Sequence, residues 1–237
     1  MIRLRHSATT HVGRVRKLNE DSTLCMPEQR LWVVSDGMGG HAAGDFASQT
    51  VVDCIAALPL VQDAGDRMHA LRAAILRAHA VIQAESAARG GATIGATVVA
   101  LMISDEHFVV FWAGDSRLYR LRGGQIELLT PDHSVVGELV TAGRLSWDEA
   151  DLHPQSNAIT RAVGVGEDLD LDKQHGEVAR GDRFLLCSDG LSKYAGFGML
   201  RQVLATTPIE TVADRLLQIA LAGGGADNIS AIVVDAV

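Results

Sequence analysis

Acidic residues recur at the ends of segments that have the composition of buried strands. The segments Val33–Gly37 and Leu186–Gly190 both end in Ser-Asp-Gly, which places Asp36 and Asp189 at equivalent positions. A third segment ends in Gly114-Asp115-Ser116, Asn19-Glu20-Asp21 precedes the first strands, and Asp227-Asn228 precedes the last. Each cluster alone could be a simple turn, since Asp and Gly favour turns at strand ends. Brought together, the five would need positive charge among them, because buried unpaired carboxylates are costly.

A divalent metal is the simplest source of that charge. The chain has few cations near the acidic clusters. Arg14, Arg16 and Lys17 precede Asn19-Glu20-Asp21, and Arg117 follows Gly114-Asp115-Ser116. The candidate ligands are all oxygens, without the Cys/His spacing of a zinc site, which favours magnesium or manganese. Gly37 would let its backbone carbonyl approach an ion as well. Such ions activate water and neutralise phosphoryl groups, and a guanidinium such as that of Arg16 grips phosphate.

Composition and motifs exclude several other functions. Lys and Arg total 21 against 29 Asp and Glu, a net charge of −8 that argues against nucleic-acid binding. The chain has no Walker-type segment, GxSxG elbow or HExxH motif. The longest apolar run, from Ile94 to Ile103, is too short to cross a membrane. Three cysteines without a CxxC pair, and no signal-peptide core at the N-terminus, favour a cytoplasmic protein with reduced thiols.

The elements that must position the acidic clusters follow from periodicity. Apolar residues at three- and four-residue steps predict helices over about 45–58 and from about 68 to the glycines at 90–91, and Thr207-Pro208-Ile209-Glu210 predicts a capped helix start. A shorter helix is expected to open at Thr130-Pro131. Strands are expected at Leu31–Ser35, Thr97–Ile103, Phe108–Ala113, Arg117–Arg122, Gln125–Leu129, Arg183–Ser188 and Ile229–Val234.

The order of these elements predicts the fold class. Gly123-Gly124 is a hairpin signal, and the strands and long helices are grouped rather than strictly alternating. This pattern favours an α+β protein with antiparallel sheets. The 237 residues contain no repeat or long linker, so we expect a single domain over 1–237.

The ordered motifs resemble the metal-dependent protein phosphatases of the PPM class (protein phosphatase 2C), specifically the compact bacterial serine/threonine phosphatases. The resemblance runs nearly from end to end of the chain. The matching segments are Arg16–Asp21, Ser35–Asp45, Gly95–Thr97, Gly114–Arg117, Leu129–Ser134, Ile159–Gly164, Ser188–Leu191 and Asp227–Ser230.

The resemblance implies an antiparallel β-sandwich with helices on both outer faces and a two-metal centre at one end. By position, Asp36 would bridge two Mn²⁺ or Mg²⁺ ions and Asp189 and Asp227 would hold the first. Glu20 and the carbonyl of Gly37 would face the second, and Asp21 would orient water. Asp115, with Asp189, would contribute to a third, weaker metal site, and Arg16 would grip the substrate phosphate.

Three features near the site depart from the family pattern or vary within it. Met38 stands where some members carry a histidine proposed as general acid, and His41 is an alternative donor, although a structural role in the turn is favoured. Asp45 replaces the usual glutamate at a helix start, where either acid suits the helix dipole. Residues at about 134–157 correspond to a variable flap subdomain beside the active site, in which Trp147 either packs within the flap or contacts substrate.

The implied reaction is hydrolysis of phosphoserine or phosphothreonine in proteins by metal-activated water, opposing a serine/threonine kinase. Two alternatives stay open at this point: a catalytically weak module that binds phosphoproteins, and a metal hydrolase of small phosphate esters. The retained carboxylates at 20, 36, 189 and 227 favour an active enzyme over the binding module. Phosphorylated proteins and a cognate kinase are the expected partners, without nucleic acid or membrane, and a monomer is expected.

Overall fold

The computed structural model describes residues 2–39, 43–150, 153–155 and 158–237. The strands are β1 Leu4–His11, β2 Asp21–Met26, β3 Leu31–Gly39, β4 Ile94–Ala96, β5 Val98–Ser104, β6 His107–Ala113, β7 Arg117–Arg122, β8 Gln125–Leu128, β9 Asp172–Glu177, β10 Arg183–Cys187 and β11 Ile229–Ala236. The helices are η1 Pro27–Gln29, α1 Gly44–Ala56, α2 Ala64–Ala88, α3 Val135–Thr141, α4 Trp147–Ala150, α5 Asp189–Ser192, α6 Phe197–Thr206 and α7 Ile209–Gly223.

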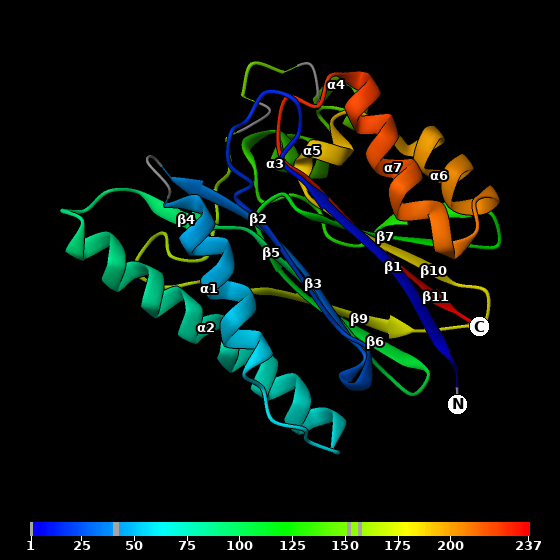
Figure 1. Ribbon diagram of the computed structural model, residues 1–237, viewed down its shortest axis with the longest axis horizontal. Coiled ribbons are helices and arrows are strands. Elements are labelled where there is room, and N and C mark those ends of the chain that lie inside the picture. The colour runs from blue at the N-terminus through cyan, green and yellow to red at the C-terminus, as the bar shows by residue number, and fades with distance from the viewer. Residues whose placement is uncertain (1, 40–42, 151–152, 156–157) are drawn as a thin grey trace.

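Two antiparallel sheets lie face to face between pairs of helices (Figure 1). One sheet has the order β1-β11-β10-β7-β8, and the other has the order β2-β3-β5-β6-β9 with β4 beside β3. Helices α1 and α2 cover the outer face of the second sheet, and α6 and α7 cover that of the first. These layers confirm the predicted α+β sandwich with helices on both faces.

The strands near the centre of the sandwich are buried on both faces. In β3, Trp32 and Val34 belong to the core between the sheets, whereas Leu31 and Val33 belong to the core beneath α1 and α2. A strand covered on both sides needs apolar side chains at every position, which explains why these segments are continuous apolar runs without polar alternation.

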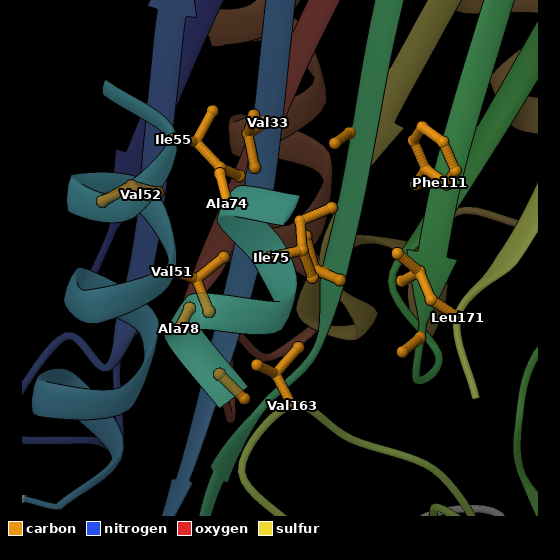
Figure 2. Packing of buried hydrophobic residues seen from close by; sticks show 14 of the residues in the cluster. Val33, Val51, Val52, Ile55, Ala74, Ile75, Ala78, Phe111, Val163 and Leu171 are labelled. Carbon is orange, nitrogen blue, oxygen red and sulfur yellow. The ribbon is translucent and has the colours of Figure 1, made fainter. Parts of the chain in front are cut away.

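The outer cores follow from helix periodicity. Apolar residues of α1 and α2 recur at three- and four-residue steps and so share one face of each helix. Figure 2 shows Val51 and Ile55 of α1 and Ile75 of α2 directed toward the strands that carry Val33 and Phe111. A similar stripe of α7 packs on the opposite sheet with residues of β10 and β11. None of the helices in the described ranges is long and apolar enough to cross a membrane.

Two helix starts differ from expectation. Thr207 does not cap α7; it ends α6, and Pro208 precedes the first turn of α7 without a side-chain cap. The helix expected at Thr130-Pro131 begins later, at Val135, where Ser134 accepts a hydrogen bond from the amide of Gly137. The elements absent from the prediction are β1, β2, β4, β9, η1, α4, α5 and α6. Of the three free cysteines, Cys187 is buried, whereas Cys54 and Cys25 are only partly buried.

All five acidic clusters lie at one end of the sandwich. Strand β3 carries Asp36 toward its end, α5 begins at Asp189 directly after β10, and β11 begins just after Asp227. Both chain termini lie at the other end, as Figure 1 shows. The strand directions of the two sheets therefore deliver the acidic side chains to a common region.

Candidate metal centre

Asp21 and Asp36 are brought together by strand pairing. They are direct cross-strand partners in the β2–β3 ladder. Thr97 holds the end of β3, because its hydroxyl accepts a hydrogen bond from the Asp36 amide at 2.9 Å and its amide donates to the Asp36 carbonyl at 2.8 Å. The pairing of β2 with β3 therefore makes the two acidic residues neighbours.

Asp189 and Asp227 approach through a contact that only glycine permits. A Cβ on Gly190 would lie 1.9 Å from the carbonyl oxygen of Asn228, so a larger residue would force the two segments apart. Ser188 connects this pair to the other sheet: its hydroxyl donates to Asp21 at 2.8 Å and accepts from the Ser230 amide at 3.0 Å.

Asn228 fixes the loop that carries Arg16 and Glu20. Its side-chain oxygen accepts a hydrogen bond from the Glu20 amide at 2.7 Å. Its side-chain nitrogen donates to the carbonyls of Val12 and Leu18, both at 2.9 Å. All three bonds bring the loop against the start of β11, and Asn228 is buried.

Glu20, Gly37 and Gly44 form a small oxygen-lined space. A Cβ on Gly44 would lie 2.5 Å from Oε1 of Glu20 and 2.8 Å from the carbonyl oxygen of Gly37. Both oxygens therefore face the same point at the first residue of α1. A carboxylate and a backbone carbonyl are suitable ligands for Mg²⁺ or Mn²⁺, and the missing side chain at Gly44 keeps the space open.

Asp115 lies deeper, at the end of β6, and is only 5% exposed. It lines the same cleft as Asp189, Arg16 and Asp227, a space of about 450 Å³. Its neighbour Ser116 shares a 2.7 Å hydrogen bond with the hydroxyl of Thr97. The cleft thus joins the predicted substrate-binding arginine to three predicted metal ligands, Asp115, Asp189 and Asp227.

The buried carboxylates repel one another. Loss of hydration, together with the charges of Asp189 and Asp227, raises the pKa of Asp21 to about 7 although Ser230 and Ser188 oppose the rise. Burial followed by Asp189 and Asp132 raises the pKa of Asp115 to about 8. Burial and the surrounding carboxylates also raise the pKa of Asp36 well above its ordinary value. Such crowding is the electrostatic environment that a multivalent cation relieves.

Among the described residues, Arg16 and Lys193 form ion pairs with carboxylates of the cluster. Arg16 forks onto Asp227, with both nitrogen–oxygen distances at 3.0 Å, and Lys193 contacts Asp189 at 2.5 Å. Within the described ranges, no three His, Cys, Asp or Glu side chains are already gathered as ligands around one point. Asp21 and Asp189 each retain a buried Oδ1 without a hydrogen-bond partner in those ranges. These orphaned oxygens, together with the space at Gly44, fit a bound divalent cation.

One wall of the cleft is tied to the predicted flap. Arg117 of β7 forks onto Asp132 at 2.8 and 2.7 Å, and its guanidinium stacks on the ring of Trp147 at 4.4 Å. Both charged partners are almost fully buried. Trp147 therefore packs against Arg117 of β7, outside the flap, whereas its packing interpretation placed the contact within the flap.

The remaining predicted residues have simple placements. Asp45 is in the first turn of α1, as expected, and Met38 pairs with Gly95 across the β3–β4 ladder. His41 lies outside the described residues. Sequence reasoning assigned no role to Asn228, Ser188 or Thr97, although all three lie within its motifs, and it overlooked Lys193. The four-residue spacing of Lys193 from Asp189 was the available signal.

Comparisons with known proteins identify the family of this chain. The sequence profile of Protein phosphatase 2C matches residues 10–222. The serine/threonine protein phosphatase PstP of Mycobacterium tuberculosis is 37% identical over 235 residues, covering 99% of this chain and 45% of PstP. The chain therefore spans less than half the length of that relative.

Solved structures also resemble this chain over its whole length. PppA, described as a key regulatory component of T6SS in Pseudomonas aeruginosa, superposes with a TM-score of 0.92 at 44% identity, covering 99% of this chain and 98% of that one. The catalytic domain of PstP in complex with two manganese ions superposes with a TM-score of 0.90 at 35% identity, covering 100% of both chains. The resemblance predicted from the motifs is confirmed, and this chain belongs to the protein phosphatase 2C family.

Proposed function

We propose that this chain hydrolyses phosphoserine and phosphothreonine in proteins with two bound Mn²⁺ or Mg²⁺ ions. The observation that carries the proposal is the meeting of five acidic clusters at one end of the sandwich, with orphaned carboxylate oxygens inside and Arg16 in the lining of the cleft. The two manganese ions of the PstP catalytic domain support the cofactor.

The ligands divide between the two sheets. Asp36 is central, because the charges of Asp21, Asp115, Asp189 and Asp227 all act on it, and it would bridge the ions. Asp189 and Asp227 would hold one ion, while Glu20 and the carbonyl of Gly37, which face a common point, would hold the other. Bound ions of this kind lower the pKa of water and neutralise charge on the phosphoryl group.

Arg16 and Asp21 have different tasks. Arg16 is half-exposed, and its planar guanidinium can present two parallel donors to phosphate oxygens. Asp21 has one oxygen held by Ser188, whereas Oδ1 is free to accept a hydrogen bond or a proton from the attacking water. The first residue would bind substrate, and the second would orient the nucleophile.

The proposal extends to the setting of the enzyme. A protein-serine/threonine phosphatase needs a kinase that supplies its substrate, and the likeness to PppA supports a role in T6SS regulation. Three free thiols fit a reducing cytoplasm. We also propose a monomeric catalytic domain over 1–237 in which residues at about 134–157 form the flap. Size-exclusion chromatography with light scattering would test the monomer.

The decisive experiment compares a phosphothreonine peptide, a phosphotyrosine peptide and a small aryl phosphate under Mn²⁺, Mg²⁺ or chelator. We expect metal-dependent turnover with a strong preference for phosphothreonine over phosphotyrosine. Activity that survives complete chelation would overturn the metal-dependent mechanism. Turnover of the aryl phosphate alone would favour a small-ester hydrolase. Tight phosphopeptide binding without turnover would favour the binding module.

A further inference from the structure

Lys193 places an ammonium group beside the metal-ligand cluster. Its backbone amide donates to the carbonyl of Asp189 at 2.9 Å, so the two residues are one helical turn apart. Because residues four apart share a helix face, the lysine side chain lies along that of Asp189. Nζ contacts Oδ2 of Asp189 at 2.5 Å, and both side chains are less than one-third exposed.

Lys193 and Asp115 line the same cleft. Lys193, Asp189 and Asp115 line one space, and the charges of both carboxylates act favourably on the lysine. The repulsion that Asp189 and Asp132 exert on Asp115 is opposed by two cations, Lys193 and Arg117. The positive charge of Lys193 therefore acts on both acidic residues that the resemblance assigned to a third metal ion, Asp115 and Asp189.

Arg117 is engaged elsewhere. Its guanidinium forks onto Asp132 and also donates to the hydroxyl of Tyr119 at 3.1 Å. Its face is stacked on Trp147. These contacts direct its guanidinium toward Asp132, Tyr119 and Trp147, whereas Lys193 is the cation paired with Asp189 among the described residues.

We propose that the Lys193 ammonium takes the place of the third divalent ion, so that this chain binds two ions and supplies the third cation itself. The inference rests on the proposed function for the two principal ions. It concerns a residue that holds charge and position at the edge of the centre, and no covalent step is assigned to it.

The test counts bound manganese without substrate, by equilibrium dialysis with elemental analysis and by anomalous diffraction from crystals. We expect two ions in the wild type and in Lys193→Arg, which keeps the charge. Lys193→Gln removes the charge at similar length and is expected to bind a third ion, seen beside Asp115. The double variant Lys193→Gln/Asp115→Asn is expected to return to two.

Lys173→Gln is the matched control, because Lys173 is an exposed lysine on β9 and its loss changes the net charge equally. It is expected to bind two ions. Three ions in the wild type, or two in a folded Lys193→Gln verified by its thermal melting, would overturn the inference. Two ions in the wild type without turnover of the phosphothreonine peptide would overturn the proposed function alone.

Discussion

Arg16 has two anionic partners, the Asp227 carboxylate in the structure and the substrate phosphate in the proposed reaction. Arg16→Ala should lower kcat/KM for a phosphothreonine peptide about 10- to 100-fold, because a hydrogen bond to a charged group contributes about 1.5–3 kcal/mol. Manganese affinity should be retained, since Asp227 loses only a competing cation. Steady-state kinetics and metal titration check both parts, and loss of bound manganese would contradict the assignment.

Asp36 is the carboxylate on which the charges of four other carboxylates act, those of Asp21, Asp189, Asp115 and Asp227. Asp36→Asn should abolish turnover and binding of both principal ions, because the proposed bridging ligand becomes neutral. The same variant should melt at a higher temperature than the wild type in chelator at alkaline pH, since one repelling buried charge is gone. Differential scanning calorimetry checks this. Asp168→Asn, an exposed site outside the cluster, is the control and should change neither property.

The gathering of acidic side chains at one end of the sandwich was predictable, because the repeated Ser-Asp-Gly pattern places equivalent carboxylates at strand ends. The ion pairs of Arg16 with Asp227 and of Lys193 with Asp189 illustrate what was missed. The first joins residues 211 positions apart, so its geometry depends on the whole sandwich. The second lies within one helical turn and could have been predicted from spacing.

Helix α1 contributes to the site because its first residue, Gly44, has no side chain. Gly44→Ala should weaken manganese binding at the Glu20 side, because the new Cβ would lie 2.5 Å from Oε1 of Glu20 and displace that carboxylate. The fold should survive with a lower melting temperature, because the same Cβ would also lie 2.8 Å from the backbone carbonyl oxygen of Gly37. Metal titration with thermal melting checks both parts. Gly198→Ala in α6, where a Cβ meets nothing within 4 Å, should retain metal affinity.

At the level of elements, prediction depended on the strength of local patterns. Helices α1 and α2 and the buried strands have long apolar patterns and were found with small boundary errors. Strand β9 was missed because Lys173, His175 and Glu177 are polar and exposed at a sheet edge. Helix α6 was missed because it opens at Gly196-Phe197-Gly198, and its end shares Thr207 with the turn into α7.

The whole molecule should lose stability with rising pH when no metal is present. The folded-state pKa values of Asp21 and Asp115, about 7 and about 8, lie above their ordinary value of 3.8. At pH values between the ordinary pKa of 3.8 and the raised pKa values, the folded protein therefore binds more protons than the unfolded chain. Its free energy of unfolding falls as pH rises through that range. Melting temperature in chelator should decrease from about pH 5 to about pH 8.

Saturating manganese should reduce the decrease of melting temperature with pH. Asp115→Asn should reduce the same decrease in chelator. An equally steep decrease with and without metal would contradict the electrostatic account. Buffers that do not chelate and a matched ionic strength are needed, because salt screens the exposed charges of the remaining surface.

The pairing of the first and last strands has a practical consequence. Leu4 lies opposite Ala236, and reciprocal hydrogen bonds of 3.0 and 2.8 Å join Arg3 and Val237. These residues are at the end of the sandwich away from the acidic clusters (Figure 1). A short peptide linker would therefore join them into a circular permutant, and a bead or fluorophore attached there would leave the acidic cleft at the opposite end unobstructed.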